Sequence, residues 1–254
     1  MDEAEDKYAD GARYCARDDL LVLLDEWGVY PDRVLDIGCG TGLMGQRMLR
    51  RGARDVWGIE PQQRAFATAN RRLSRVINST FPCPGLAGEH FDLVVMADVL
   101  EHTVDPWGIL RLVPPLLTDA GMVLISLPNV SHVNVIAQLA RGRWTYSQEG
   151  LLDRTHLRFF TPSTTMDLIE GAGLHVVRRF DQRLEGRRRL RWPAALLRPV
   201  FPHLTTLHVV TLSRASTGTA ASSSGVVQEG ALAHEGACAD AHVPPRGTAG
   251  TGVK

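Results

Sequence analysis

Apolar and polar positions along the chain fall into alternating blocks of two kinds. Short, mainly apolar runs, typical of strands buried on both faces of a parallel sheet, occur at 34–37, 55–59, 91–96 and 122–127. Stretches in which apolar residues recur every three or four positions, as in an amphipathic helix, occur at 16–27, 43–51, 61–73 and 107–117. Strands and helices in alternation predict a doubly wound α/β sheet.

The pattern continues with weaker signals in the second half of the chain. A short third strand is predicted at 76–77. A helix is predicted from 162 to 171, because Thr161 is a good N-cap and a proline occupies the first helical position. Two further apolar strands are predicted at 174–180 and 207–212, which brings the sheet to seven strands.

Composition limits the function without naming it. The 254 residues suit one sizeable domain with some excess, and 44% apolar content is ordinary for a globular protein. Lys plus Arg equals Asp plus Glu, so we expect no nucleic-acid partner. The four cysteines form no Cys-x-x-Cys pair, so neither a metal site nor a disulfide framework is expected. The acidic N-terminus and the absence of a membrane-length apolar run predict a cytoplasmic protein.

A glycine-rich turn follows the first predicted strand. Gly38, Gly40 and Gly42 occupy alternate positions, which suits a turn whose backbone closely approaches a ligand. The helix that follows directs its N-terminal N–H groups at the turn, so a nucleotide cofactor fits there. Leu43 stands where the dinucleotide fingerprint needs its third glycine, which disfavours NAD. The alternative is a glycine turn without a ligand.

Two acidic residues accompany the turn. Asp36 precedes the first glycine by two positions, and Glu60 stands at the end of the second predicted strand. At that edge of a parallel sheet a carboxylate can accept hydrogen bonds from both ribose hydroxyls of a nucleoside. The alternative for Glu60 is a surface residue that starts a helix. The turn, Asp36 and Glu60 together resemble the first two motifs of the class I S-adenosylmethionine (SAM) dependent methyltransferases.

The resemblance implies a Rossmann-like sheet of seven strands, with the last strand antiparallel between the fifth and sixth. It also implies SAM as cofactor. Further residues are then expected near the cofactor: Tyr14 and Arg17 before the first strand, Asn78 after the third and Asp98 after the fourth. Tyr14 and Arg17 are equally compatible with a packing tyrosine and a surface arginine.

Two strings extend the resemblance. Asp-Val-Leu-Glu-His at 98–102 follows the fourth strand, and Leu-Leu-Asp-Arg-Thr-His-Leu-Arg-Phe-Phe at 151–160 resembles a bacterial subgroup associated with cell-surface glycan or secondary-metabolite pathways. We expect 142–161 to fold over the cofactor pocket as a lid. Because imidazole titrates near neutral pH, His156 is the first candidate general base and His102 the second. Both are also compatible with a structural role.

Other polar residues are candidate acceptor contacts. They follow the fifth strand or belong to the lid, and they are Asn129, His132, Asp153, Arg154 and Arg158. The alternative is that Asp153 pairs with Arg154 or Arg158 and only orders the lid.

Two segments fall outside this scheme. The 181–206 segment is rich in arginine with interleaved apolar residues, a composition suited to peripheral contact with an anionic membrane or to a solvated charged helix. Residues 214–254 are mostly small or proline and contain no aromatic residue, so we expect a disordered tail after a domain that spans 1–213, with 1–15 flexible.

The combined interpretation is a methyltransferase. O-methylation of a small-molecule secondary metabolite, as in antibiotic biosynthesis, or of a glycan intermediate is favoured. N- or C-methylation is the alternative reaction, and a SAM-binding partner protein without catalysis is the alternative class. The sequence leaves the acceptor and the oligomeric state open.

Overall fold

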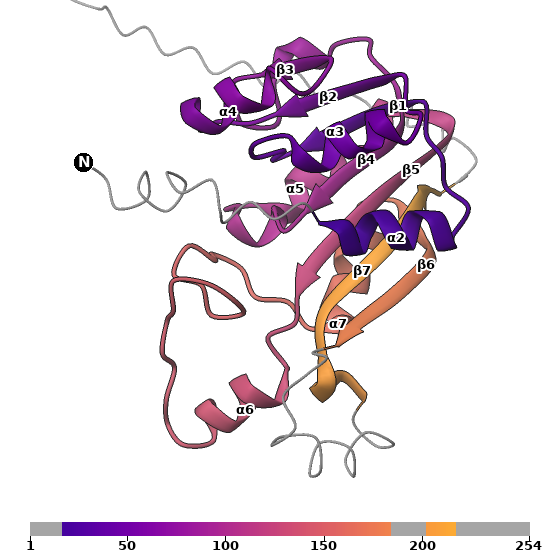
Figure 1. The fold of residues 1–254 in the computed structure, drawn as a ribbon. Helices are drawn as coiled ribbons and strands as arrows, with labels where there is room; N and C mark the ends of the chain where they lie inside the picture. The colour runs from indigo at the N-terminus through magenta and orange to yellow at the C-terminus, as the bar shows by residue number, and fades with distance from the viewer. Residues whose placement is uncertain (1–16, 184–201, 217–254) are drawn as a thin grey trace, which may run out of the picture. The chain divides into compact units, whose positions relative to one another are not determined.

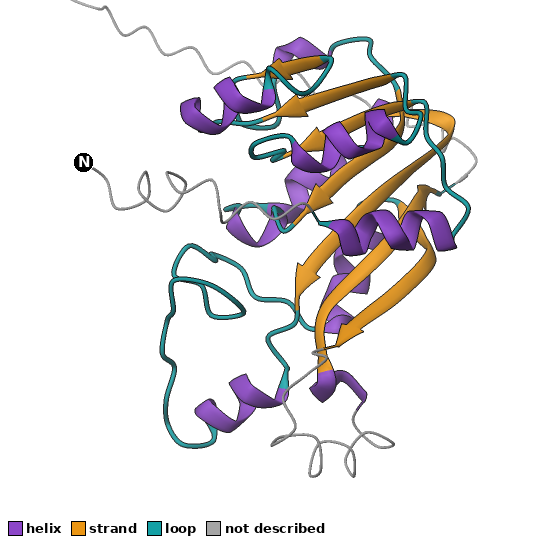
Figure 2. Ribbon diagram, in the orientation of Figure 1, coloured by secondary structure: helices purple, strands orange, loops and turns teal. Residues whose placement is uncertain are grey.

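The architecture is a seven-stranded sheet with helices on both faces (Figures 1 and 2). The structure is a computed structural model that describes residues 17–183 and 202–216. The chain divides into one unit, Met1–Thr217, and a second, Gly218–Lys254, which lies wholly outside the described residues. The expected disorder of 1–15 and of the tail from 217 onward therefore falls outside the described residues, as does 184–201 within the basic segment.

Seven strands form the sheet in the order β3-β2-β1-β4-β5-β7-β6. Their bounds are β1 Arg33–Ile37, β2 Asp55–Ile59, β3 Arg75–Ile77, β4 Phe91–Ala97, β5 Leu117–Pro128, β6 Leu174–Arg183 and β7 Thr206–Ala215. The first five strands are parallel, whereas β7 pairs antiparallel with both β5 and β6. The predicted fold class and the predicted insertion of the seventh strand between the fifth and sixth are both confirmed.

Helices cover the two faces of the sheet. Their bounds are α2 Asp18–Glu26, α3 Leu43–Arg50, α4 Gln63–Ala69, α5 Pro106–Arg111 and α7 Pro162–Glu170, whereas a further helix, α6 Val133–Leu139, follows β5 and lies away from the sheet (Figure 1). The core on one face joins α2 and α3 to the sheet, and the core on the other face joins α5 and α7 to it. Successive strand residues feed opposite cores, as Val34 and Leu35 do in β1.

Some predicted bounds differ from the observed ones for local reasons. The helix predicted at 107–117 ends at Arg111 and is followed by a 3₁₀ turn, η3 Pro114–Leu116, because the two prolines supply no N–H donors to an α-helix. Strand β5 begins at Leu117 instead of 122, with an irregular register opposite β4. Strand β7 continues to Ala215, past the predicted domain end at 213.

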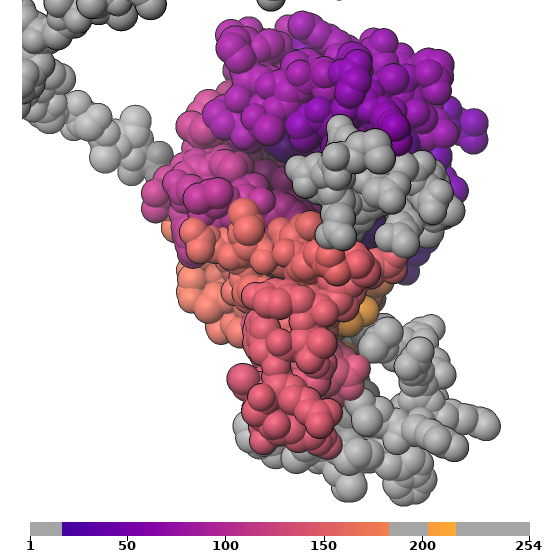
Figure 3. All heavy atoms as spheres, turned by 90° about the vertical axis from the view of Figure 1, so that its left-hand side faces the viewer, coloured from indigo at the N-terminus to yellow at the C-terminus, as the bar shows by residue number. Residues whose placement is uncertain are grey.

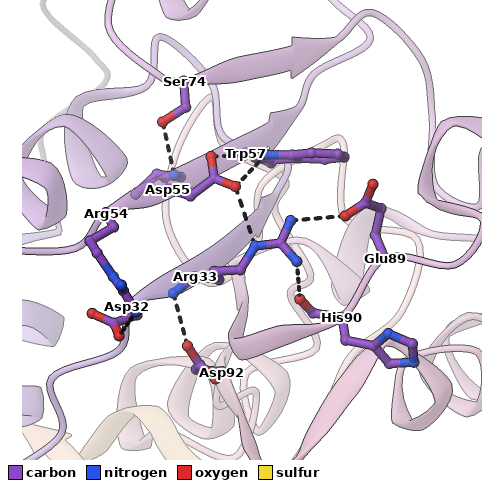
Figure 4. A network of polar contacts seen from close by, with 10 residues as sticks. Asp32, Arg33, Arg54, Asp55, Trp57, Ser74, Glu89, His90 and Asp92 are labelled. Atoms are coloured by element: carbon purple, nitrogen blue, oxygen red, sulfur yellow. Dashed lines mark hydrogen bonds and ion pairs between the residues drawn. The ribbon is translucent and has the colours of Figure 1, made fainter.

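A polar network ties together the beginnings of the central strands (Figure 4). The Arg33 backbone N–H donates to Asp92 over 2.9 Å, and its guanidinium donates to the His90 carbonyl over 2.7 Å. The same guanidinium pairs with Glu89 and with Asp55. The network lies at the N-terminal edge of the sheet, so it positions the strands without taking part in the opposite edge, where the glycine turn lies.

Within the described part of the chain, no helix combines the length and the apolar character that crossing a membrane requires.

Candidate active site

The glycine turn lies at the carboxyl end of β1 and leads into α3. All three glycines have positive φ angles: 72° at Gly38, 54° at Gly40 and 75° at Gly42. The backbone N–H groups of Gly38 and Cys39 donate to the carbonyl of Ile59 over 2.9 and 3.1 Å, which anchors the turn to the end of β2. A Cβ on Gly38 would lie 2.7 Å from a methyl carbon of Val99. The turn is therefore a cradle that only glycine forms without strain.

Glu60 faces the turn from the end of β2. Its carboxylate accepts the Gly40 N–H over 2.9 Å and the Gln62 N–H over 2.8 Å. Burial raises the pKa of Glu60, and the two backbone N–H groups oppose that rise. Burial, followed by the charge of Glu60, raises the pKa of the nearby Asp36 to about 7. Two buried carboxyl groups at one edge of a sheet are ready to accept hydrogen bonds from a ligand.

A cavity of about 580 Å³ opens at the carboxyl ends of β1, β2 and β4. Figure 3 shows this side of the molecule, with the segment from α6 to α7 in pink to salmon below the half in indigo to purple. The cavity brings together six residues that the sequence analysis singled out: Arg17, Asp36, Gly38, Glu60, Asp98 and His102. Its volume lies in the range of small-molecule sites.

Arg17 and Asp98 form an ion pair at one wall of the cavity. The Arg17 guanidinium also pairs with Asp19 over 2.9 Å and donates to the Ser126 hydroxyl over 3.2 Å. Burial alone would lower the pKa of Arg17, but the carboxylates of Asp98 and Asp19 outweigh burial and raise it. Asp98 has a positive φ of 55°, and His208 lies 3.6 Å from its carboxylate. Tyr14, the other residue expected here, lies outside the described residues.

Asn78 has a different position from the one expected. Its amide donates to the carbonyl of Glu60 over 2.8 Å and to that of Pro61 over 3.1 Å, so it braces the chain after β2. The cavity wall at this place consists of the next three residues, Ser79, Thr80 and Phe81. The sequence analysis did not select these three residues, because the chain after so short a strand carries no periodic signal.

The two candidate bases lie against each other. His102 belongs to the 3₁₀ turn η2 Leu100–His102 and lines the cavity, whereas the described cavity wall does not include His156. Their rings meet edge to face with centroids 4.8 Å apart. The carbonyl of Glu101 accepts the backbone N–H groups of Leu157 and Arg158 over 2.8 and 3.0 Å. The 142–161 segment, a long loop in Figure 2, is therefore fastened to the chain directly beside the cavity.

Charged residues of that segment hold its local shape. Asp153 is buried and accepts the backbone N–H and the hydroxyl of Thr155 over 2.8 and 2.7 Å. Arg158 donates to the carbonyl of Val104 over 3.0 and 2.6 Å. Arg154 is exposed. None of these three charged side chains is among the residues that line the described cavity.

Asn129 and His132 occupy structural positions after β5. The Asn129 amide donates to the carbonyls of His203 and Thr206, each over 2.8 Å, and joins the end of β5 to the start of β7. His132 is the N-cap of α6 and accepts the Asn134 N–H over 3.2 Å; burial lowers its pKa. Neither side chain is on the described cavity wall, so the structure gives no acceptor contact for them.

A group of potential metal ligands lies beside His102. One ligand atom from each of Glu101, His102 and His156 lies within 4.8 Å of the others. The prediction from sequence was that no metal site is present, because short Cys and His spacings are lacking and His156 is distant from the other two residues in sequence.

Residues 8–179 match the sequence family described as Methyltransferase domain. The chain belongs to this family, and with the seven-stranded sheet just described it is a class I SAM-dependent methyltransferase family member. SAM is the cofactor of the family.

Individual relatives agree with this assignment. A protein of Cereibacter sphaeroides described as "Ubiquinone biosynthesis O-methyltransferase" is 33% identical over 155 residues, which are 58% of this chain and 62% of that protein. The chain thus spans less than two thirds of this curated relative. A SAM-dependent methyltransferase from Archaeoglobus fulgidus has the same fold, with a TM-score of 0.57 at 17% identity, covering 78% of this chain and 93% of that one. Magnesium protoporphyrin IX methyltransferase from Synechocystis PCC 6803, solved with bound SAH, gives a TM-score of 0.54 at 14% identity, covering 78% and 81%.

The cavity residues fit SAM. Gly38 lies on the cavity wall, where a Cβ would collide with Val99, and Glu60 holds a buried carboxylate at the same wall. Glu60 would accept the ribose hydroxyls, while Asp36 and the ion pair of Arg17 with Asp98 would face the charged methionine portion. SAM supplies an electrophilic methyl group on a sulfonium.

Proposed function

We propose that this protein transfers the SAM methyl group to a hydroxyl oxygen of a small-molecule acceptor. The observation that carries the proposal is one continuous cavity with the glycine turn and Glu60 at one part of its wall and His102 at another. The volume of this cavity, about 580 Å³, lies within the range of small-molecule sites. The curated relative's printed name supports oxygen as the methylated atom.

The chain's own contribution to catalysis is positioning. Methyl transfer needs the acceptor oxygen, the methyl carbon and the sulfur nearly in line and close to reacting distance, and holding this geometry accounts for much of the rate enhancement. The acceptor hydroxyl must also lose its proton. His102, with Glu101 and His156 behind it, is the group of side chains placed to promote that loss.

The acceptor class is the finer part of the proposal. A secondary metabolite or a glycan intermediate with a free hydroxyl fits the resemblance of 151–160. Two aromatic residues of the 142–161 segment pack on each other, with the ring centroids of Trp144 and Phe159 5.3 Å apart. A second, separate proposal is that 181–206 contacts an anionic membrane surface; residues 184–201 of this segment lie outside the described residues.

A transfer assay tests the proposal against the alternative of a SAM-binding protein without catalysis. The full-length protein is incubated with methyl-labelled SAM and with fractions of an extract of its source organism, and products are separated by mass. Transfer of label to a small hydroxylated compound is expected. Tight SAM binding without transfer to any fraction would instead support the binding protein.

The matched variants are Gly40→Val and Gly88→Ala. Both replace a glycine of positive φ, but Gly88 lies in open space away from the cavity. Gly40→Val should abolish SAM binding in calorimetry, because it places a side chain on the ligand cradle, whereas Gly88→Ala should retain it. Equal binding by both variants would contradict the cofactor site.

A further inference from the structure

A cluster of metal-ligating side chains lies where η2 meets the 142–161 segment. Glu101 and His102 come from η2, and His156 comes from the segment; their ligand atoms lie within 4.8 Å of one another. His102 also lines the cavity. One carboxylate and two imidazoles are the donor set of many catalytic zinc sites and of other first-row transition metals.

Glu101 supplies a second, independent observation. Glu101 is 1% exposed, and within residues 17–183 and 202–216 its Oε2 atom has no hydrogen-bond partner. A buried carboxylate oxygen without a partner is costly. A cation bound at this oxygen would remove that cost, so the carboxylate is placed for a ligand that the protein atoms do not supply.

The two histidines are oriented by backbone carbonyls. The Nδ1 atom of His102 lies 3.1 Å from the Thr155 carbonyl oxygen, and Nδ1 of His156 lies 3.3 Å from that of Leu151. Because a carbonyl oxygen only accepts, each Nδ1 carries the proton, and the neutral ring then has its lone pair on Nε2. This carbonyl–histidine arrangement is the usual support of a metal-ligating imidazole.

We propose that Glu101, His102 and His156 bind a divalent first-row transition-metal cation whose remaining coordination positions face the cavity and take the acceptor's hydroxyl oxygen. This inference rests on the proposed O-methyl transfer and specifies how the acceptor is held. It replaces the expectation of no metal site. A ligating histidine has no free lone pair, so neither histidine then acts as the general base.

The reaction balances without a protein base. Coordination lowers the pKa of the acceptor hydroxyl, and its proton passes to solvent water. The acceptor oxygen attacks the SAM methyl carbon, so an O–C bond forms and the S–C bond breaks. The electron pair of that bond stays on sulfur, which becomes a neutral thioether. A tetrahedral cation about 2.1 Å from each ligand atom would hold those atoms roughly 3.4 Å apart. The three ligand atoms lie within 4.8 Å of one another, so side-chain rotations that draw them together would complete the site.

Calorimetry with metal ions tests the site directly. The full-length protein is stripped with a chelator and titrated with Zn²⁺, and separately with Co²⁺, whose visible spectrum reports nitrogen and oxygen ligation. We expect one site that is lost, or weakened by well over about 100-fold, in His156→Gln, because the loss of a supporting residue costs only about 10- to 100-fold. His175→Gln, at an exposed histidine of β6, is the control and should bind like the wild type.

The outcomes separate this inference from the proposed function. Zn²⁺ binding that is equal in wild type and His156→Gln would overturn the metal site. Full methyl transfer by the stripped protein would also overturn it, yet leave the proposed function standing. Zn²⁺ bound at the cluster with no hydroxylated acceptor methylated would contradict the proposed function alone. Glu101→Gln gives a second test of ligation. If this variant fails to fold, the test rests on His156→Gln, because His156 is only partly buried.

Discussion

At the scale of residues, the cofactor end of the cavity is defined by carboxyl groups that folding removes from water. Asp36 and Glu60 both have pKa values raised first by burial, and the charge of Glu60 adds to the rise at Asp36. The backbone N–H groups of Gly40 and Gln62 stabilise only the Glu60 carboxylate. Under the proposed cofactor site, SAM binding would compensate a cost that the free protein bears at Asp36.

The raised pKa of Asp36 predicts a pH-dependent stability of the free protein. In the unfolded chain this carboxyl group titrates near 3.8, and in the folded chain at about 7. Between these values the folded state binds the extra proton, so stability is fully present below the lower pKa and falls as pH rises towards the upper one. The free energy of unfolding should change by a few kcal/mol across this range, because a difference of one in pKa corresponds to about 1.4 kcal/mol.

Denaturant titrations at several pH values measure this effect. The free energy of unfolding of the wild type should fall with rising pH across that window, beyond the fall seen in Asp36→Asn. Saturating SAM should reduce this difference in pH dependence between the wild type and Asp36→Asn. Identical pH profiles for wild type and Asp36→Asn would show that Asp36 is not buried as described.

At the scale of elements, the antiparallel strand β7 is fixed by contacts that are distant in sequence. Asn129 is buried, and its amide bonds the carbonyls of His203 and Thr206, which lead into β7. Its side-chain oxygen accepts from the backbone and the hydroxyl of Ser131. Sequence analysis selected Asn129 as an acceptor contact because it follows a strand, but position at a strand end does not show which way a side chain points.

Asn129→Ala should destabilise the fold. The substitution removes the amide donor from one buried and one partly buried carbonyl oxygen, which costs about 2–3 kcal/mol. Ser131→Ala is the matched control, since it removes a hydroxyl contact and keeps the bonds between β5 and the start of β7, and it should cost less than about 1 kcal/mol. Urea unfolding measures both. A smaller effect for Asn129→Ala than for Ser131→Ala would contradict the bracing role.

The same scale shows what sequence patterns capture. The predicted strand at 55–59 coincides with β2, and the N-cap Thr161 begins α7 as expected, because both depend on neighbouring residues. The cavity wall at Ser79–Phe81 and the meeting of His102 with His156 depend on how distant segments pack, and no local period records that.

At the scale of the whole molecule, the two edges of the sheet have separate tasks. The Arg33 network joins the beginnings of the central strands, while the cavity lies at their ends. Parallel sheets bind ligands at the carboxyl edge, so the alternation of strands and helices was enough to predict which edge holds the cavity. It could not predict the acceptor.

Arg33→Ala tests this division. It removes charge-assisted hydrogen bonds from a partly exposed side chain and should cost about 1–2 kcal/mol of stability, with SAM affinity unchanged. Arg54→Ala is the control, because Arg54 pairs only with Asp32 among the described residues and its side chain is 77% exposed. Chemical denaturation and calorimetry give the two readouts. A loss of SAM affinity in Arg33→Ala without unfolding would contradict the separation of the edges.

The most direct test of the account is the identity of the bond that forms. The full-length protein is incubated with SAM carrying a ¹³C-labelled methyl group and with the acceptor found in the transfer assay, and the product is examined by NMR. The account predicts a methyl carbon with the chemical shift of a methyl ether, formed by the wild type and not by Gly40→Val. A methyl carbon attached to nitrogen or carbon would contradict O-methylation.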